Sequence, residues 1–209
     1  MAKIKLPTKS PHIDMTPMVD LFSLLLTFFM LTTTFRPSEV APIDMPFSVS
    51  EKPKPDANIM VVLVSKDGRV FFDLDNGPDT LLMFRSKVLQ EMGTRYNITF
   101  TPEELRKFGK LASFGMPVSN IKAWIAAKEP KEKEALNTGI PMDSTDNQLE
   151  MWILFTRKVN PNVQACIKGD ADADFKQVKK VLDILQGKNV NRFNLITNLD
   201  AKVEVKLEQ

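Results

Sequence analysis

The feature that most constrains this chain is an apolar run near its start that contains one aspartate. Residues 16–35 read TPMVDLFSLLLTFFMLTTTF, with Asp20 inside the run. A helix of 20 residues rises about 30 Å, the hydrocarbon thickness of a bilayer. Thr16 followed by Pro17 is a favourable helix start, and Arg36-Pro37 is a favourable stop. The run therefore predicts a transmembrane helix over residues 16–35.

Three lysines, Lys3, Lys5 and Lys9, precede this run. A basic start followed by an apolar run also occurs in cleaved signal peptides, which remain the alternative. The run is longer than the apolar part of a signal peptide, and no small-x-small cleavage site follows it, so an uncleaved anchor is favoured. The positive-inside rule then predicts that residues 1–15 are a cytoplasmic N-terminus and that the chain after the span lies outside.

The polar residues of the run fall on one face of the expected helix. At about 100° per residue, Asp20, Ser23, Thr27 and Thr34 lie within about 60° of one another, and Thr16 joins the same stripe. A charged carboxylate in hydrocarbon is costly. A single polar stripe is typical of a helix that lines a polar path or packs against other helices. The alternative is that Asp20 sits near the headgroups and contacts water without a role.

The composition excludes several classes of protein. The 209 residues suit one membrane anchor plus one modest domain, and the net charge of +2 gives no basic face for nucleic acid. Cys166 and His12 are the single residues of their kinds. A disulfide within the chain is therefore impossible, and a Cys/His zinc site is not expected. We expect Cys166 to be a small buried strand residue and His12 to be an exposed loop residue.

Residues 36–57 contain five prolines and several charges. This composition predicts an extended, semi-rigid linker rather than a packed element. Its role is either that of a spacer or that of a strap that pairs with a neighbour and leaves it. The remaining residues, 58–209, form the expected outer domain.

Apolar patterns of strand and helix period alternate within residues 58–209 and predict an α/β (α+β) fold, a small two-layer domain. Lys66-Asp67-Gly68 joins two apolar runs into a hairpin over residues 58–73. After residue 144 we expect a helix over 147–158, capped by Ser144, Thr145 or Asp146, and then a strand at 163–168. A second helix should begin at Asp174, with Gln177 as its capping partner, and stop at Gly187. A strand at 192–197 and an edge strand at 202–208 should follow, and a second copy of the chain could pair with that edge strand. Trp152 and Phe155 are expected in the core.

Residues of about 78–144 look like a helical insertion. Thr101-Pro102 starts one expected helix over 101–114, and a second lies within 119–136. The mixed lysines and glutamates of 128–134 are expected to be a solvated face, and a partner-docking role for this helical segment remains the alternative.

The chain lacks the common catalytic motifs: it has no Gly-rich phosphate loop, no H-E-x-x-H and no G-x-S-x-G. Asp170, Asp172 and Asp174 alternate as in a calcium loop, but Phe175 and Val181 stand where that loop needs glycine and glutamate. Acidic residues at a helix start explain the three aspartates better. The sequence therefore predicts neither an enzyme nor a metal site.

Two stretches resemble the ExbD/TolR family of biopolymer transport proteins. DMTPMVDLFSLLLTFFMLTT, residues 14–33, resembles the family's N-terminal anchor: a Thr-Pro, two apolar residues and an aspartate, here Thr16, Pro17 and Asp20. Residues 162–197 resemble its periplasmic strand-helix-strand. The chain departs from the family in its length, so nothing about residues 78–144 is inherited.

The resemblance implies a subunit of a motor in the bacterial inner membrane, driven by the proton-motive force, that energises outer-membrane transport. Asp20 would carry the protons, which act as coupling ions, and no other cofactor is implied. The implied partners are an ExbB/TolQ-like polytopic subunit, as a pentamer holding two of these anchors, a second copy of the chain, and a TonB- or TolA-like transducer. Peptidoglycan and membrane lipid are further possible contacts.

Two other functions remain open. The chain could be a membrane-tethered periplasmic binding module, for a partner or for peptidoglycan, in which Asp20 conducts no protons. The other open function is a membrane-tethered enzyme that uses the insertion. The residues alone do not choose between import, envelope maintenance and gliding as the process that is energised.

Overall fold

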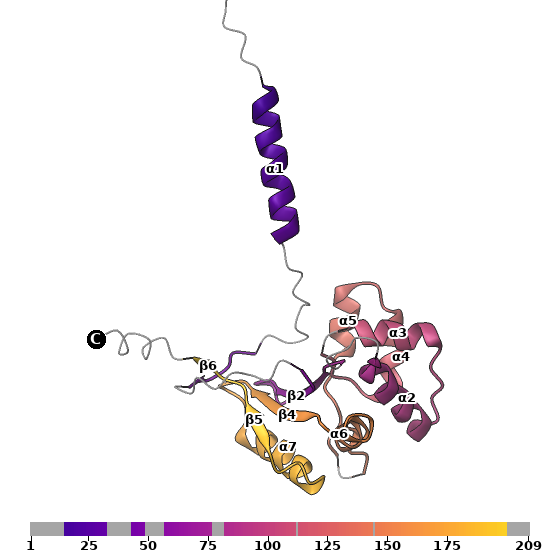
Figure 1. Ribbon diagram of the computed structural model, residues 1–209. Coiled ribbons are helices and arrows are strands. Elements are labelled where there is room, and N and C mark those ends of the chain that lie inside the picture. The colour runs from indigo at the N-terminus through magenta and orange to yellow at the C-terminus, as the bar shows by residue number, and fades with distance from the viewer. Residues whose placement is uncertain are drawn as a thin grey trace, which may run out of the picture. The chain divides into compact units, whose positions relative to one another are not determined.

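The chain forms two units, Met1–Pro37 and Ser38–Gln209. The computed structural model describes residues 15–32, 43–48, 57–76, 82–111, 113–143 and 145–199. The first unit contains the helix α1 (Thr16–Thr32), which is drawn in indigo in Figure 1. The second unit contains the strands and the remaining helices.

Helix α1 begins at Thr16, as the sequence predicts. The Val19 N–H donates to the Met15 carbonyl at 3.0 Å and forms the first helical turn. The helix has 17 residues. Among the residues that the structure describes, no helix is both long enough and apolar enough to cross a membrane. Residues 33–35, and Thr34 with them, lie outside the described residues, so the span over 16–35 stays a prediction.

A four-stranded sheet forms the centre of the second unit, in the order β3-β2-β4-β5. Its strands are β2 (Ile59–Val64), β3 (Val70–Leu74), β4 (Gln164–Gly169) and β5 (Phe193–Leu195). The β2–β3 pair is antiparallel, and β4 runs parallel to both β2 and β5. The predicted hairpin is confirmed: Gly68, at φ 76°, closes the turn, and its N–H donates to the Ser65 carbonyl.

Two long helices follow the predicted order. They are α6 (Gln148–Val159) and α7 (Phe175–Gly187), and the strand-helix-strand β4-α7-β5 is confirmed. The cap of α6 is Asn147, one residue after the three candidates, because its side chain accepts from the Glu150 N–H. Gly187 is the last helical residue rather than the stop. Asn189, at φ 59°, makes the left-handed turn instead.

Capping of α7 also differs in one detail. The Asp174 carboxylate caps the helix, as predicted, but it accepts from the Lys176 N–H at 2.9 Å rather than from that of Gln177. The Gln177 side chain instead lies against the hairpin turn at Gly68. The turn and the helix start therefore pack together.

The described residues between β3 and α6 include five helical elements. They are α2 (Phe84–Tyr96), α3 (Pro102–Lys110), the 3-10 turn η2 (Val118–Asn120), α4 (Ile121–Ala126) and α5 (Pro130–Leu136). Helix α3 starts where the sequence predicts. The expected helix within 119–136 is two helices, because Ala127 leaves the helical conformation and Pro130 starts a new one. Helix α2 is not among the predicted elements.

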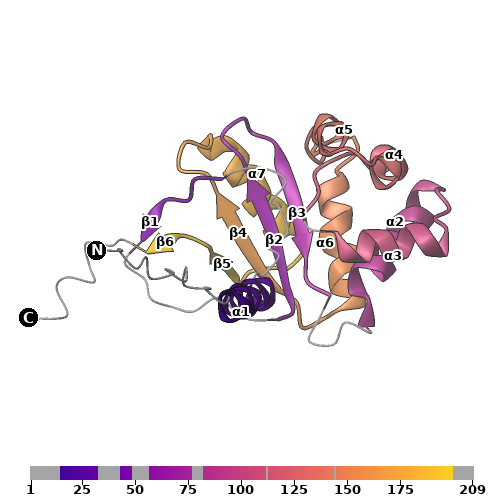
Figure 2. The same cartoon turned by 90° about the horizontal axis from the view of Figure 1, so that it is seen from above.

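This segment is part of the main core. The core combines Met60, Phe72 and Trp152 with Val88, Leu89, Met92, Phe108, Phe114 and Met116 of the segment. Figure 2 shows β2, β3 and β4 side by side, with α6 and α2 beyond β3. The Phe72 and Phe114 backbones exchange hydrogen bonds at 2.7 and 2.9 Å, which cover the edge of β3. The insertion is therefore built into the domain rather than attached to it.

A second apolar cluster lies on the other side of the sheet. Ile59, Val61, Leu63, Phe71 and Cys166 are packed there with Ile43. Cys166 is buried in β4, which confirms that prediction. Since the side chains of a strand alternate between its two faces, the apolar run of β2 and residues 165–167 of β4 supply both clusters.

Part of the predicted linker is packed against the domain. Strand β1 (Phe47–Ser48) pairs in parallel with β6 (Asn198–Leu199) of the same chain, and Ile43 is buried. The prediction of an unpacked linker is wrong for residues 43–48, because Ile43 is buried and Phe47–Ser48 pairs with a strand far along the chain. The edge strand expected at 202–208 lies outside the described residues.

Candidate functional site

Four polar residues share one face of α1. Thr16, Asp20, Ser23 and Thr27 all lie within the helix, at spacings of four, three and four residues. Residues at these spacings lie above one another on a helix. The structure thus brings together four members of the predicted stripe, and Thr34 falls outside the described residues.

The hydroxyl of Thr27 is oriented by its own helix. It donates to the Leu24 carbonyl at 2.9 Å. Because this bond uses the hydroxyl proton, the oxygen keeps its lone pairs for an incoming donor, such as a water molecule or a protonated carboxyl group. Thr32 makes the same type of bond, to the Phe28 carbonyl at 3.0 Å, but it lies off the stripe.

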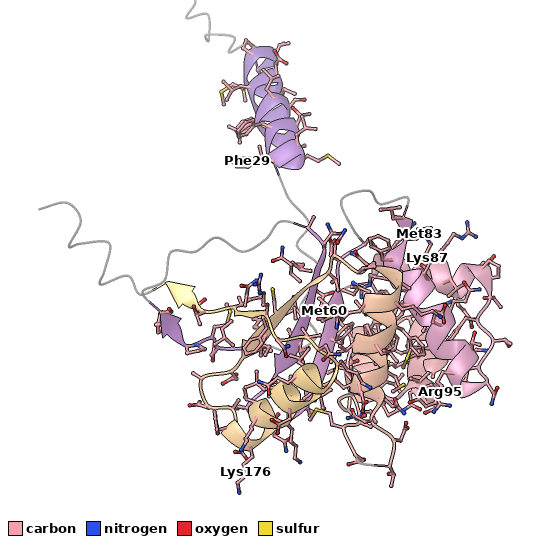
Figure 3. The ribbon with its side chains drawn as sticks, turned by 60° about the horizontal axis from the view of Figure 1, so that its bottom comes forward. Phe29, Met60, Met83, Lys87, Arg95 and Lys176 are labelled. Carbon is pink, nitrogen blue, oxygen red and sulfur yellow. The ribbon has the colours of Figure 1, made fainter. Side chains whose placement is uncertain are left out.

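Asp20 is the only ionisable side chain in α1. One proton therefore changes the net side-chain charge of the helix between −1 and 0. The rest of the surface is apolar and exposed: Phe29 is 56% exposed and Leu31 is 86% exposed. Figure 3 shows Phe29 among the side chains that project outward around α1. Contiguous apolar surface of this extent marks a site for lipid or for a protein partner.

The three aspartates after β4 are turn and cap residues. The Asp170 carboxylate accepts from the Asp172 N–H at 3.0 Å and from the Asp44 N–H at 3.2 Å. Asp174 caps α7. Asp170 thereby fastens residues 43–48 to the end of β4. Within the described ranges, no group of three or more potential metal ligands occurs. His12 lies outside these ranges.

One ion pair of the domain joins a buried arginine to a partly exposed aspartate. Arg85, at the start of α2, donates to Asp73 of β3 at 3.0 Å and to the Leu74 carbonyl at 3.2 Å. Its guanidinium also lies over the Phe108 ring, 5.6 Å from the centroid. Burial lowers the pKa of Arg85, and the Asp73 carboxylate partly offsets that effect. The pair joins the insertion to the sheet, which is a structural role.

Two hollows on α2 have no counterpart in the sequence predictions. One has a volume of about 460 Å³ and the other about 450 Å³, and both are lined by Gln90 and Thr94. The only local signal in the sequence is Gly93, a glycine within a helix, followed by Asn97 at the helix end. A glycine at such a position indicates that another part of the chain lies close to the helix backbone. The residues that line the first hollow all lie between Gln90 and Leu105, and the second hollow adds Val159 of α6.

Comparison with known proteins gives one match. The sequence profile of the family described as Biopolymer transport protein ExbD/TolR matches residues 7–200. The match covers α1, both sheets and the insertion. No curated protein and no solved structure gives a significant match.

Proposed function

The chain belongs to the ExbD/TolR family of biopolymer transport proteins, and from this premise we propose that it is the single-span subunit of a motor in the bacterial inner membrane. In this proposal the proton-motive force drives the motor, and Asp20 carries the protons. The members of this family are components of transport systems rather than known enzymes. The observation that carries the proposal is that α1 holds a single ionisable side chain, within a stripe of hydroxyl groups.

The proposed mechanism uses the two charge states of Asp20. A protonated Asp20 is neutral and tolerates an apolar wall, whereas an ionised one needs a polar or cationic partner. Each charge that crosses the membrane supplies about 2.3 kcal/mol per 100 mV. If the two charge states favour two positions of the helix, proton flow is converted into rotation or displacement of α1. Ser23 and Thr27 supply hydrogen bonds along the route.

The proposal requires partners, because one helix cannot enclose a path. The residues of α1 and those that follow it would span the membrane, with the N-terminus in the cytoplasm and the second unit in the periplasm. An ExbB/TolQ-like polytopic subunit, as a pentamer, would surround two copies of α1. The periplasmic unit would pass the motion to a TonB- or TolA-like transducer or hold peptidoglycan.

The test is proton uptake by vesicles that contain the chain with its co-purified polytopic partner. Asp20→Asn keeps the shape of the side chain but cannot titrate, so we expect it to abolish uptake while assembly stays normal. Asp20→Glu keeps a titratable group and serves as the matched control, with partial uptake expected.

Equal uptake by the wild-type complex and the Asp20→Asn complex would contradict the proposal. Asp20 would then be an interfacial acid without a role, and a membrane-tethered binding module would explain the chain better. Co-purification of the Asp20→Asn chain with the polytopic partner measures assembly. A variant that no longer co-purifies has a folding or assembly defect, which is thereby distinguished from a transport defect.

A further inference from the structure

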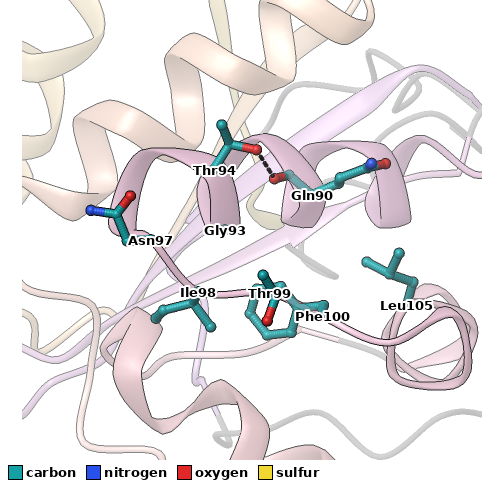
Figure 4. A pocket seen from close by; sticks show the side chains of 8 residues that line it. All are labelled: Gln90, Gly93, Thr94, Asn97, Ile98, Thr99, Phe100 and Leu105. Carbon is teal, nitrogen blue, oxygen red and sulfur yellow. Dashed lines mark hydrogen bonds between the residues drawn. The ribbon is translucent and has the colours of Figure 1, made fainter.

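A hollow of about 460 Å³ lies between the C-terminal half of α2 and the segment that follows it. Its lining includes Gln90, Thr94, Asn97, Ile98, Phe100 and Leu105, and Figure 4 shows them from close by. Pockets for small ligands usually measure about 300–1,000 Å³. The hollow thus has room for one large side chain with part of its backbone.

Gly93 lets the two walls approach each other. A Cβ atom at this position would lie 2.4 Å from the Ile98 carbonyl oxygen and 2.9 Å from the Phe100 ring. The Ile98 N–H donates to the Gly93 carbonyl at 2.8 Å, and Asn97 adopts a left-handed conformation at φ 55° to make the turn. The segment 97–100 is therefore held against the helix by its backbone.

The lining combines neutral hydrogen-bonding groups with an apolar floor. The side chains of Gln90 and Asn97 carry exposed carboxamides, while Ile98, Phe100 and Leu105 are half-buried. None of the lining side chains is charged. Within the described part of the chain, the backbone N–H groups of Thr99 and Phe100 make no hydrogen bond. Carboxamides and open backbone amides are the groups that pair with another peptide backbone.

A second hollow continues from the first. Its lining is Lys87, Gln90, Glu91, Thr94 and Val159, so the row of Gln90 and Thr94 separates the two. The Thr94 hydroxyl donates to the Gln90 carbonyl at 3.1 Å, the dashed line in Figure 4. The Glu91 carboxylate in the second hollow is paired with the Lys158 ammonium at 2.9 Å.

We propose that these hollows bind an extended, uncharged peptide segment of a partner protein, with one apolar side chain over Ile98, Phe100 and Leu105. No cationic side chain lines the first hollow, and the Lys122 ammonium lies over the Phe100 ring. A sugar would need an open aromatic face, but the Phe100 ring lies against Gly93 and has the Lys122 ammonium 5.8 Å from its centroid. The inference concerns the insertion together with Val159 of α6, and it does not depend on proton transport by Asp20.

The test titrates the isotope-labelled full chain, in detergent micelles, with acetyl-Ala-Leu-Ala-amide and follows the backbone amide signals by NMR. We expect the Thr99 and Phe100 signals to shift in a saturable manner. Acetyl-Ala-Asp-Ala-amide should bind at least tenfold more weakly, because a carboxylate would lie on the apolar floor. Chitobiose, as the sugar probe, should leave both signals in place.

Two variants locate the site. Thr94→Trp places a large side chain on the row between the hollows and should weaken binding of the leucine peptide at least tenfold. Arg95→Trp puts the same side chain on the next residue of α2, which lines neither hollow, and should bind as the wild type does. Both positions are exposed, and the thermal unfolding of each variant checks its fold.

Three results would overturn the proposal. Absence of any shift with the leucine peptide would leave the hollow without a peptide ligand. A shift with chitobiose but not with the peptide would assign the site to a glycan. Equal peptide binding by the wild type and Thr94→Trp would place the peptide elsewhere on the chain.

Discussion

Gly93 and Gly187 both lie in helices, but they differ in the space around the Cα atom. A Cβ atom on Gly93 would meet the Ile98 carbonyl oxygen at 2.4 Å, whereas one on Gly187 would meet nothing within 4 Å. We expect Gly93→Ala to lower the free energy of unfolding by about 1–3 kcal/mol through overpacking. Gly187→Ala should leave it unchanged or raise it by up to about 1 kcal/mol.

Chemical denaturation of the two glycine variants, beside the wild-type chain, measures this difference. An unchanged stability of Gly93→Ala would mean that segment 97–100 moves away from α2 at little cost. That outcome would also remove the rigid wall of the hollow.

Tyr96 links the pH dependence of stability to a single hydrogen bond. Its hydroxyl donates to the Asp146 carboxylate at 2.7 Å. Burial, together with this bond, raises the pKa of Tyr96 from 10.0 to about 12. A group with a raised pKa in the folded state contributes stability that is complete below its unfolded pKa. This contribution is lost as the pH rises through the folded pKa.

The expected result for Tyr96→Phe has two parts. The variant should be less stable than the wild type near pH 7 by about 1 kcal/mol, the value of one hydrogen bond. The difference should shrink between pH 10 and pH 12, where the wild type loses its contribution. Denaturation curves at several alkaline pH values check this, and a constant difference across that range would contradict the assignment.

At the scale of elements, α3 depends on its cap. The Thr101 side chain accepts from the Glu104 N–H, and the Glu104 carboxylate accepts from the Thr101 N–H at 2.7 Å. Thr101→Ala should lower the free energy of unfolding by about 1 kcal/mol. Thr99→Ala, an exposed threonine without a capping role, is the matched control and should change it little. Thermal unfolding followed by circular dichroism distinguishes the two.

The same capping logic explains which elements the sequence predicts. Helix α3 has Thr101, Pro102 and Glu104 in the order that starts a helix, and α7 has Asp174, so both are predictable from local residues. Helix α2 lacks such a start: Met83 precedes it at φ 48° and makes no side-chain cap. Its helical state is set by tertiary contacts, namely the burial of Val88, Leu89 and Met92.

Long-range pairing sets the other unpredicted elements. Strand β1 is described at Phe47 and Ser48, and it exists because it meets β6, which lies 151 positions further on at the paired residues Phe47 and Asn198. No local pattern in 36–57 marks these two residues. The polar stripe of α1 is predictable because it needs only helical spacing, whereas the first hollow on α2 depends on the left-handed turn at Asn97, which places Ile98 and Phe100 against the helix.

At the scale of the whole molecule, the insertion and the sheet share one core. Phe114 of the insertion lies 4.7 Å from Trp152 of α6 and 6.0 Å from Phe72 of β3, between ring centroids. Phe114→Ala should therefore destabilise the entire second unit, by about 3–5 kcal/mol. Calorimetry should show a single transition for this unit, moved to lower temperature.

Phe47→Ala is the control for this change, because Phe47 is 71% exposed and its loss should move the transition little. Two separate calorimetric transitions in the wild-type chain would show that the insertion unfolds on its own. That result would contradict the shared core.

Both tryptophans of the chain, Trp124 and Trp152, are buried in this shared core. Trp124 lies in the insertion and Trp152 in α6. Each indole would therefore become exposed to water if the insertion separated from the sheet and α6. The chain thus contains its own optical reporter. The emission maximum of the tryptophan fluorescence should shift to longer wavelength when the insertion separates from the sheet. It should stay unchanged when only α1 or residues 43–48 move.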